Sequence, residues 1–361
     1  MKTAKIVLIN LLVFLLLDIL LGVFLPKLFS GGTKKPANAE KDFRIPHNVF
    51  HHALRENFSG SSTWGPFKYG MNTDNFGFKS VQGKTTAKEK KGKRTIWIGD
   101  SFTEGIGLNY EQSFVGKFSS KYPNHEMINM GVVSYSPELY KKKLKYFDSA
   151  GLQYDQVVVC LDISDIEDEL IYAGGRNIVL DFNESAMQRF IFRIKETIKS
   201  MSQYSITSRM LYTALYDSKF SPNLERTYYN QRGEWIKSDK IFNKWGKDGL
   251  TIATKNMVEI ADFCKMRNKP LFLVIYPWPQ YVGKPESYKR YTDHWQQFCS
   301  SHHVNFINLF DAFQTESAKL GNQNCLEKYY FKDDVHFNEA GNEFLFNAMD
   351  STLNSVFKFP L

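Results

Sequence analysis

The chain has 361 residues, with 46 Lys and Arg against 38 Asp and Glu, and a formal net charge of +8. Hydrophobic residues make up 43% and aromatic residues 15%, so the chain can bury a sizeable core, which excludes intrinsic disorder, collagen and coiled coil as its dominant class. The four cysteines contain no CxxC pair, which excludes a disulfide scaffold and argues against a structural zinc site.

Residues 6–25 form an apolar run that is interrupted by one acid, Asp18. A helix of this length spans about 30 Å, the thickness of a bilayer core. A secretory signal has a shorter apolar stretch, and the nearest small-residue cleavage site, at 37–39, lies well past the run. We therefore expect residues 1–26 to be an uncleaved membrane anchor, with a cleaved signal as the alternative. The acid either marks a helix partner or is simply tolerated, and we favour tolerance.

The next two segments lead into a folded domain. Residues 27–42 are small and polar and contain a proline, which is typical of a linker. Residues 43–94 are rich in aromatic and turn residues and predict short strands and loops, ending in a stretch at 83–94 with six basic residues and one acid. A polyanion-binding patch is conceivable there. Because no aromatic residue lies among the lysines, we favour a solvated loop and expect no nucleic-acid partner.

From residue 95 to residue 361 the pattern changes to alternating strands and helices. Apolar runs predict strands at 95–99, 127–131, 155–163, 270–276 and 304–310, and helical patterns follow at 137–150, 251–266, 288–301 and 338–356. This alternation predicts an α/β domain with a parallel sheet covered on both faces by helices. Residues 174 to about 250 interrupt it, and we expect a mostly helical insertion there.

Two polar clusters predict a nucleophile and its base. In open α/β sheets the site lies at the carboxyl ends of the strands. Ser101 stands in a Gly-Asp-Ser turn directly after the first of these strands, where its hydroxyl can project from the sheet and its N–H can face an oxyanion. Asp333 precedes His336 by three residues, a spacing that lets the acid hold Nδ1–H and leaves Nε2 free to take a proton. Each cluster alone is as readily a structural turn, but together they predict a Ser-His-Asp set.

The motifs stand in a recognisable order, which is GDSFTEG at 99–105, NMG at 129–131, DISD at 162–165 and DDVH at 333–336. Together they resemble the SGNH hydrolase superfamily, also called GDSL-type esterases, over roughly residues 95 to 356. The resemblance implies a flavodoxin-like three-layer α/β/α fold and hydrolysis of acyl esters with no metal or other cofactor.

Site roles follow from the same resemblance, residue by residue. Ser101 is implied to be the nucleophile and one oxyanion donor, Gly131 a second donor, His336 the base and Asp333 the acid that orients it. Ser164 departs from the family, which usually has Asn at that place. Its hydroxyl reaches about one heavy atom less far than an amide, and losing an oxyanion donor typically costs about 10²–10³ in turnover. We expect Ser164 either to donate, directly or through a water, or to cap the helix that follows.

Three functions remain open from the sequence. We favour a membrane-anchored serine esterase that removes small acyl groups, above all acetyl, from an envelope or exported carbohydrate, with its catalytic domain periplasmic or extracellular. An O-acyltransferase with the same acyl-enzyme is the first alternative, because the sequence does not show how well water is excluded. A non-catalytic glycan-binding or assembly protein is the second, and the serine at position 164 is its support. Trp64, Trp245 and Trp278 are interpreted as core or loop anchors rather than as a sugar-stacking surface.

Overall fold

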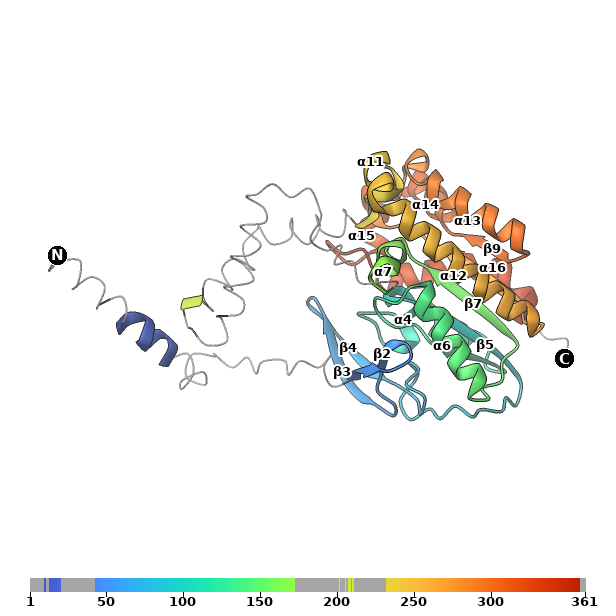
Figure 1. The fold of residues 1–361 in the computed structure, drawn as a ribbon, viewed down its shortest axis with the longest axis horizontal. Coiled ribbons are helices and arrows are strands. Elements are labelled where there is room, and N and C mark those ends of the chain that lie inside the picture. Colours follow the sequence, from blue (N-terminus) through green and yellow to red (C-terminus); the bar gives the residue numbers. More distant parts are fainter. Residues whose placement is uncertain are drawn as a thin grey trace. The chain divides into compact units, whose positions relative to one another are not determined.

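The computed structural model describes residues 10, 13–20, 43–172, 201, 205, 207, 208, 210 and 232–357. The chain divides into two compact units (Figure 1). One consists of Met1–Asn38 and Asn177–Tyr228, and the other of Ala39–Arg176 and Tyr229–Leu361. The second unit contains the α/β domain that the sequence predicts.

A five-stranded parallel sheet forms the centre of this unit. Its strands are β5 (Lys93–Gly99), β6 (His125–Asn129), β7 (Gln156–Leu161), β8 (Leu271–Ile275) and β9 (Asn305–Asn308), and they lie in the order β6-β5-β7-β8-β9. Every neighbouring pair is parallel. Numbered by their place in the chain, the five strands follow the order 2-1-3-4-5, which is the flavodoxin-like arrangement. The predicted strands and the flavodoxin-like fold class are therefore confirmed.

The longer helices fall into two groups, and the helices within each group contact one another. The first group contains α6 (Pro137–Ser149), α7 (Asp165–Tyr172), α12 (Lys247–Met266) and α13 (Lys289–His302) (Figure 1). The second contains α5 (Phe114–Lys121), α14 (Phe310–Leu320), α15 (Asn322–Tyr329) and α16 (Glu339–Phe357). Trp97 of β5 stacks on Phe118 of α5 at 4.9 Å, and Phe118 packs in turn on Phe346 of α16. The four predicted helices are confirmed, whereas α5, α14 and α15 are not anticipated from the sequence.

Shorter helices complete the described part of the domain. They are α4 (Ser101–Glu104), η1 (Tyr110–Gln112), η3 (Glu234–Ile236), α11 (Asp239–Ile241), the π-helix η4 (Phe242–Gly246), η5 (Pro279–Tyr281) and η6 (Pro285–Ser287). The predicted helical insertion at 174–250 lies mostly outside the described residues, and its longest described stretch, 232–250, is mostly helical.

The aromatic lead-in forms two antiparallel hairpins, in agreement with the short strands and loops that the sequence predicts. The first pairs β1 (Arg44–His47) with β2 (His51–Leu54), and the second pairs β3 (Ser59–Trp64) with β4 (Phe67–Asn72). The first hairpin is tied to helix α4, because the guanidinium of Arg44 donates to both carboxylate oxygens of the buried Glu104, at 2.8 and 2.7 Å. The lead-in is thus an integral part of the domain.

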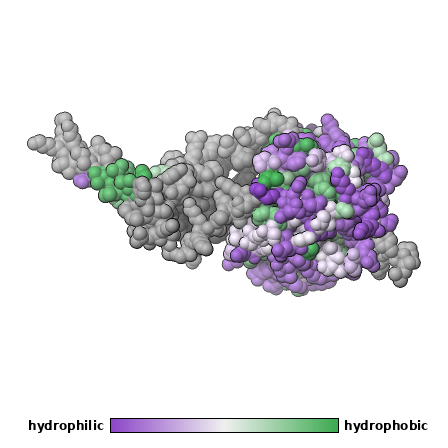
Figure 2. All heavy atoms as spheres, turned by 90° about the horizontal axis from the view of Figure 1, so that it is seen from below, coloured by the Kyte–Doolittle hydropathy of each residue, from purple (hydrophilic) through white to green (hydrophobic). Residues whose placement is uncertain are grey.

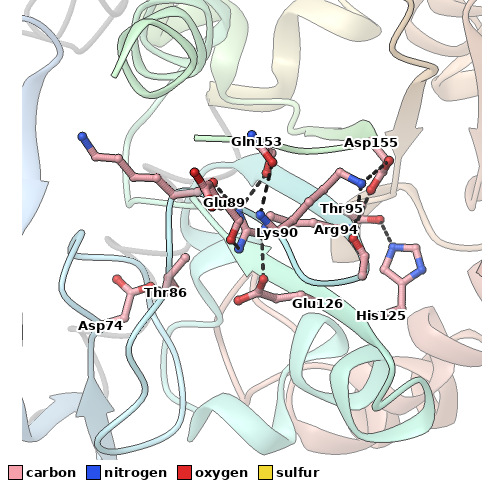
Figure 3. Close-up of polar contacts among 12 residues, drawn as sticks. Asp74, Thr86, Glu89, Lys90, Arg94, Thr95, His125, Glu126, Gln153 and Asp155 are labelled. Carbon is pink, nitrogen blue, oxygen red and sulfur yellow. Dashed lines mark hydrogen bonds and ion pairs between the residues drawn. The ribbon is translucent and has the colours of Figure 1, made fainter. Parts of the chain in front are cut away.

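The basic loop at 83–94 is fastened to the domain by its own charges (Figure 3). Arg94 is only 1% exposed, and its Nε donates to Glu126 at 2.6 Å. Lys90 pairs with Asp155 at 3.0 Å, and Lys84 lies 3.4 Å from the same glutamate. Lys93 also lies 4.0 Å from Asp155, so four of the six basic residues contact acids of the domain. The predicted solvated loop is therefore partly wrong, and these four charges are paired within the domain.

The first unit contains a short apolar helix at residues 13–20. Its seven large hydrophobic side chains are 42–62% exposed, and the visible face is hydrophobic (Figure 2). Asp18 is buried and accepts hydrogen bonds from N–H and Oγ1 of Thr207, both at 2.9 Å, and from Oγ of Ser205. The expectation that Asp18 is merely tolerated is therefore wrong, because it has partners from the same unit. Within the described stretches, no helix has the length and apolar character needed to cross a membrane, and most of the run at 6–25 lies outside them.

Candidate active site

Ser101 and His336 lie in direct hydrogen-bond contact, as the sequence predicts. Ser101 is the first residue of α4, immediately after β5, and Asp100 caps this short helix by accepting from the N–H of Phe102 at 3.0 Å. Nε2 of His336 is 2.8 Å from Oγ of Ser101. Both residues are buried, each with 6% of its surface exposed. A nucleophile and a base are thus in place.

The acid that holds the imidazole is Asp334, and the prediction of Asp333 is wrong. Oδ1 of Asp334 lies 2.6 Å from Nδ1 of His336 and also accepts from the backbone N–H of His336 at 2.9 Å. This is an Asx-type turn, in which an aspartate binds the backbone two residues further on. Asp333 sits at φ +59° on the exposed side of the turn, one residue too early to make that bond.

A tryptophan of the lead-in completes this arrangement. Nε1–H of Trp64, at the end of β3, donates to Oδ2 of Asp334 at 2.6 Å, across 270 residues of sequence. Its ring stands edge-on to the imidazole of His336, with ring centroids 5.1 Å apart. The interpretation of Trp64 as a simple loop anchor is therefore incomplete, because the residue contacts two members of the Ser-His-Asp set.

The charge state of Asp334 suits the role of an orienting carboxylate. Burial by itself would raise the pKa of Asp334, but hydrogen bonds and charge from His336, together with the indole N–H, hold that pKa below its usual value. An ionised Asp334 fixes the proton of His336 on Nδ1 and leaves Nε2 as an acceptor for the hydroxyl of Ser101. The geometry can therefore activate a serine for attack on a carbonyl.

Gly131 is close to the nucleophile helix, but its N–H is already used. It donates to Oδ1 of Asn129 at 2.9 Å, and Nδ2 of Asn129 donates to the carbonyl of Thr103 at 2.7 Å. A Cβ at position 131 would lie 2.5 Å from N of Glu104, so only glycine lets the two backbones approach this closely. This close approach is made to α4. The predicted oxyanion donor is not free in this structure.

Ser164 also turns away from the role that the resemblance implies. Its hydroxyl donates to Oδ2 of Asp162 at 2.5 Å, and its N–H donates to the same oxygen at 3.0 Å. Its carbonyl accepts from the N–H groups of Glu167 and Asp168 at the start of α7. The prediction that the hydroxyl points into the cleft as a donor is therefore wrong. The capping alternative is right for the backbone carbonyl and wrong for the side chain, which binds a buried carboxylate.

Three buried carboxylates lie together beneath Ser101. Oxygens of Asp100, Asp162 and Asp165 lie within 4.8 Å of one another, and they are the one group in the described part of the chain that could hold a metal ion. Trp278 Nε1–H donates to Asp162 and the hydroxyl of Tyr140 donates to Asp165, both at 2.7 Å. Burial and the mutual charge raise the pKa of Asp100 and of Asp165 well above the usual value. Protonation thus lowers the charge of the cluster without a cation.

Four residues at or beside the site escape prediction from the sequence. They are Trp64, Tyr140, Arg232 and Trp278, of which Arg232 forms ion pairs with Glu167 and Asp168. Each lies 25 to 270 residues along the chain from its partner, so no local spacing predicts the contact. For Asp334 the sequence does hold one signal, since the Asp-x-His spacing of residues 334–336 is typical of an Asx turn.

By sequence, the chain matches no known family and no curated protein. By structure, it is similar to a lipolytic G-D-S-L family member from Veillonella parvula (11% identity, 73% of this chain and 99% of the other, TM-score 0.41). It is also similar to an acetyl xylan esterase (14% identity, 72% of this chain and 99% of the other, TM-score 0.41). A third similar structure is a mutant of an acetyl-xylooligosaccharide esterase from Geobacillus (14% identity, 76% of this chain and 98% of the other, TM-score 0.41). These likenesses are distant, so the function proposed for the chain depends on the arrangement of Ser101, His336 and Asp334.

Proposed function

We propose that the chain is a serine esterase that hydrolyses small acyl esters, above all acetyl esters, on a carbohydrate outside the cytoplasm. One observation supports the reaction type more than any other. Ser101 Oγ, both imidazole nitrogens of His336 and Oδ1 of Asp334 form an unbroken line of contacts at 2.8 and 2.6 Å. A serine, a base and an orienting acid in this order are the requirement for acyl transfer through a covalent intermediate.

The reaction has two halves. Oγ of Ser101 attacks the ester carbonyl carbon while Nε2 of His336 takes the hydroxyl proton, and the imidazolium is stabilised by Asp334. The tetrahedral intermediate collapses, the C–O bond to the alcohol breaks, and His336 returns the proton to the departing alkoxide. A water then attacks the acyl-enzyme with His336 as base, which releases the acid and restores Ser101. The oxyanion is expected to face the N–H of Ser101 at the start of α4.

The extracytoplasmic location and the carbohydrate substrate belong to the same proposal. Seven exposed apolar side chains within residues 13–20 form a surface that water does not favour, and a bilayer would cover it. The unit would then be held at a membrane, within reach of polysaccharide in the envelope or in transit through it. The partner of the site would be an acylated carbohydrate or another small ester, without a cofactor.

The test uses the full-length chain in detergent micelles. We expect it to hydrolyse p-nitrophenyl acetate and to release acetate from acetylated xylo-oligosaccharides, and Ser101→Ala should lose both activities while keeping its circular dichroism spectrum. If Ser101→Ala retains most of the activity, the nucleophile is wrong. Turnover that requires an added sugar acceptor would make the protein an O-acyltransferase. No turnover under either condition would favour the non-catalytic alternative.

A further inference from the structure

The hairpin of β3 and β4 contacts the site through Trp64, the last residue of β3. Trp64 and Phe67 pair across the turn, with Gly65 and Pro66 between them. Trp64 lies beside Asp334 and His336, whereas Phe67 packs against Phe331, with ring centroids 4.5 Å apart and the rings tilted by 38°. The two aromatic residues of one turn therefore face two different neighbours.

The indole of Trp64 is the one side chain outside the Ser-His-Asp set that is seen bound to Asp334 in the described part of the chain. The second oxygen of Asp334 would otherwise be free to turn toward water, since this side chain is 18% exposed. A hydrogen bond from a rigid ring to each oxygen, one from the indole and one from the imidazole, fixes the rotation of the carboxylate about its Cβ–Cγ bond. Asp334 can then present Oδ1 to Nδ1 of His336 in one orientation.

The other side of the hairpin turn borders an open groove of about 870 Å³. This volume is within the range of ligand pockets, about 300–1,000 Å³. Phe67 and Lys68 form one wall, Gly107 and Asn109 from the segment after α4 form the second, and Phe331 belongs to the third. Ser101, His336 and Asp334 do not line the groove, but its lining contacts their neighbours. A Cβ at Gly107 would lie 3.6 Å from Cβ of Trp64, and N–H of Phe331 donates to the carbonyl of His336 at 3.0 Å.

The lining of the groove suits a neutral, hydroxyl-rich ligand better than an acyl chain or a phosphate. Its charged residues balance, with two lysines and two glutamates, and Lys117 of the groove pairs with Glu343. Two amide side chains line it as well and are held in place by the protein: Oδ1 of Asn109 accepts from N–H of Gly70 at 2.6 Å, and Nε2 of Gln112 donates to Glu339 at 2.8 Å. Phe67 is 38% exposed and offers a ring face against which the apolar face of a sugar ring can pack.

We propose that the β3–β4 hairpin is part of the active site in two ways. Trp64 is a positioning residue that fixes Asp334, and the turn around Phe67 forms the binding subsite for the sugar that carries the ester. This inference rests on the proposed esterase function and adds its substrate subsite. The amino-terminal lead-in then makes a direct contribution to rate and to substrate selection.

Trp64→Phe tests the positioning role, with Trp295→Phe as the matched control. Both variants remove an indole N–H, but Nε1 of the fully buried Trp295 has no hydrogen-bond partner. With p-nitrophenyl acetate, we expect Trp64→Phe to lower kcat by about 10- to 100-fold, the effect of losing a hydrogen bond to a charged group, with little change in KM. The acid limb of its pH–kcat/KM profile should move to higher pH, because a less hydrogen-bonded Asp334 attracts the proton of His336 more strongly.

Trp295→Phe should keep the kcat and the pH profile of the wild type. If both variants give the same kcat and the same profile, Trp64 has no positioning role. Should Trp64→Phe fail to fold, the indole N–H resonances of the wild type and of Asp334→Asn can be compared by NMR. A displaced Trp64 resonance in Asp334→Asn would support the coupling, and an unmoved one would overturn it.

Phe67→Ala tests the subsite, with Val49→Ala as the control. Val49 is 44% exposed and lies in the other hairpin's turn, away from the groove. We expect Phe67→Ala to raise KM for acetylated xylo-oligosaccharides by about 5- to 20-fold relative to its effect on p-nitrophenyl acetate, and Val49→Ala to leave this ratio at the wild-type value. An unchanged ratio in Phe67→Ala would overturn the subsite. Activity that survives Ser101→Ala would instead overturn the esterase function itself, so the two failures are distinguishable.

Discussion

Asp334 and Asp333 are adjacent acids with different predicted effects, which makes them a matched pair. Asp334→Asn removes the negative charge that lies 2.6 Å from Nδ1 of His336 and leaves the size of the side chain unchanged. At an effective dielectric constant of about 20, a charge pair at this distance is worth roughly 6 kcal/mol to the imidazolium that forms during catalysis. With about 1.36 kcal/mol for each factor of ten, kcat should fall by about 10⁴ or more.

Asp333→Asn should behave very differently. Asp333 is exposed at φ +59°, a left-handed backbone conformation that asparagine adopts readily, so the variant should keep the turn. We expect its kcat to stay within about twofold of the wild type. The assay is steady-state hydrolysis of p-nitrophenyl acetate by full-length protein, with folding monitored by circular dichroism. Equal losses in the two variants, or a larger loss in Asp333→Asn, would refute the assignment of Asp334 as the orienting acid.

Three further predictions concern buried polar groups. Ser164→Ala should lower the free energy of unfolding by about 1–2 kcal/mol, because it removes the hydroxyl bonded to Asp162. Turnover per folded molecule should change less than about threefold. Turnover and melting temperature are measured on the same variant, and a tenfold loss of turnover would restore the oxyanion role. Burial lowers the pKa of Lys143 to about 7, so the unfolded chain binds more protons between about pH 7 and 10, and stability should rise with pH over that window. Urea unfolding at pH 7 and pH 9 should show this rise in the wild type and a smaller one in Lys143→Met. Asp165→Asn should keep the stability of the protein at pH 8 or increase it, since burial and neighbouring acids raise the pKa of Asp165 and the amide mimics its neutral form. A stoichiometric cation that elemental analysis finds in the wild type and not in the variant would contradict this and identify a metal site.

The features predicted correctly from the sequence are those that local pattern determines. Apolar runs identify all five strands of the sheet, because both faces of a parallel sheet are covered and its strands are continuously hydrophobic. Ser101 and His336 are identified because each stands in an uncommon polar cluster, the first directly after β5 and the second shortly before α16. Local sequence thus locates the edge of the sheet at which the site lies.

The errors arise where one backbone angle or one distant partner decides the outcome. Asp333 and Asp334 differ only in which of them the turn aims at the imidazole, and the positive φ of Asp333 is not readable from the residue types. The resemblance implies that Gly131 and Ser164 donate to an oxyanion, but in the structure they donate to Asn129 and Asp162. Trp64 lies 270 residues from its acceptor, a pairing that depends on the completed fold.

Asp18 has a consequence for the maturation of the chain. Its carboxylate accepts from Ser205 and Thr207, 187 and 189 residues further on, within a unit that is built from Met1–Asn38 and Asn177–Tyr228. Proteolysis at 37–39 would discard one of these two segments and leave the hydroxyls of Ser205 and Thr207 without their acceptor. Removal of the amino terminus would therefore change the surroundings of Ser205 and Thr207, since these contacts exist only in a chain that keeps Asp18.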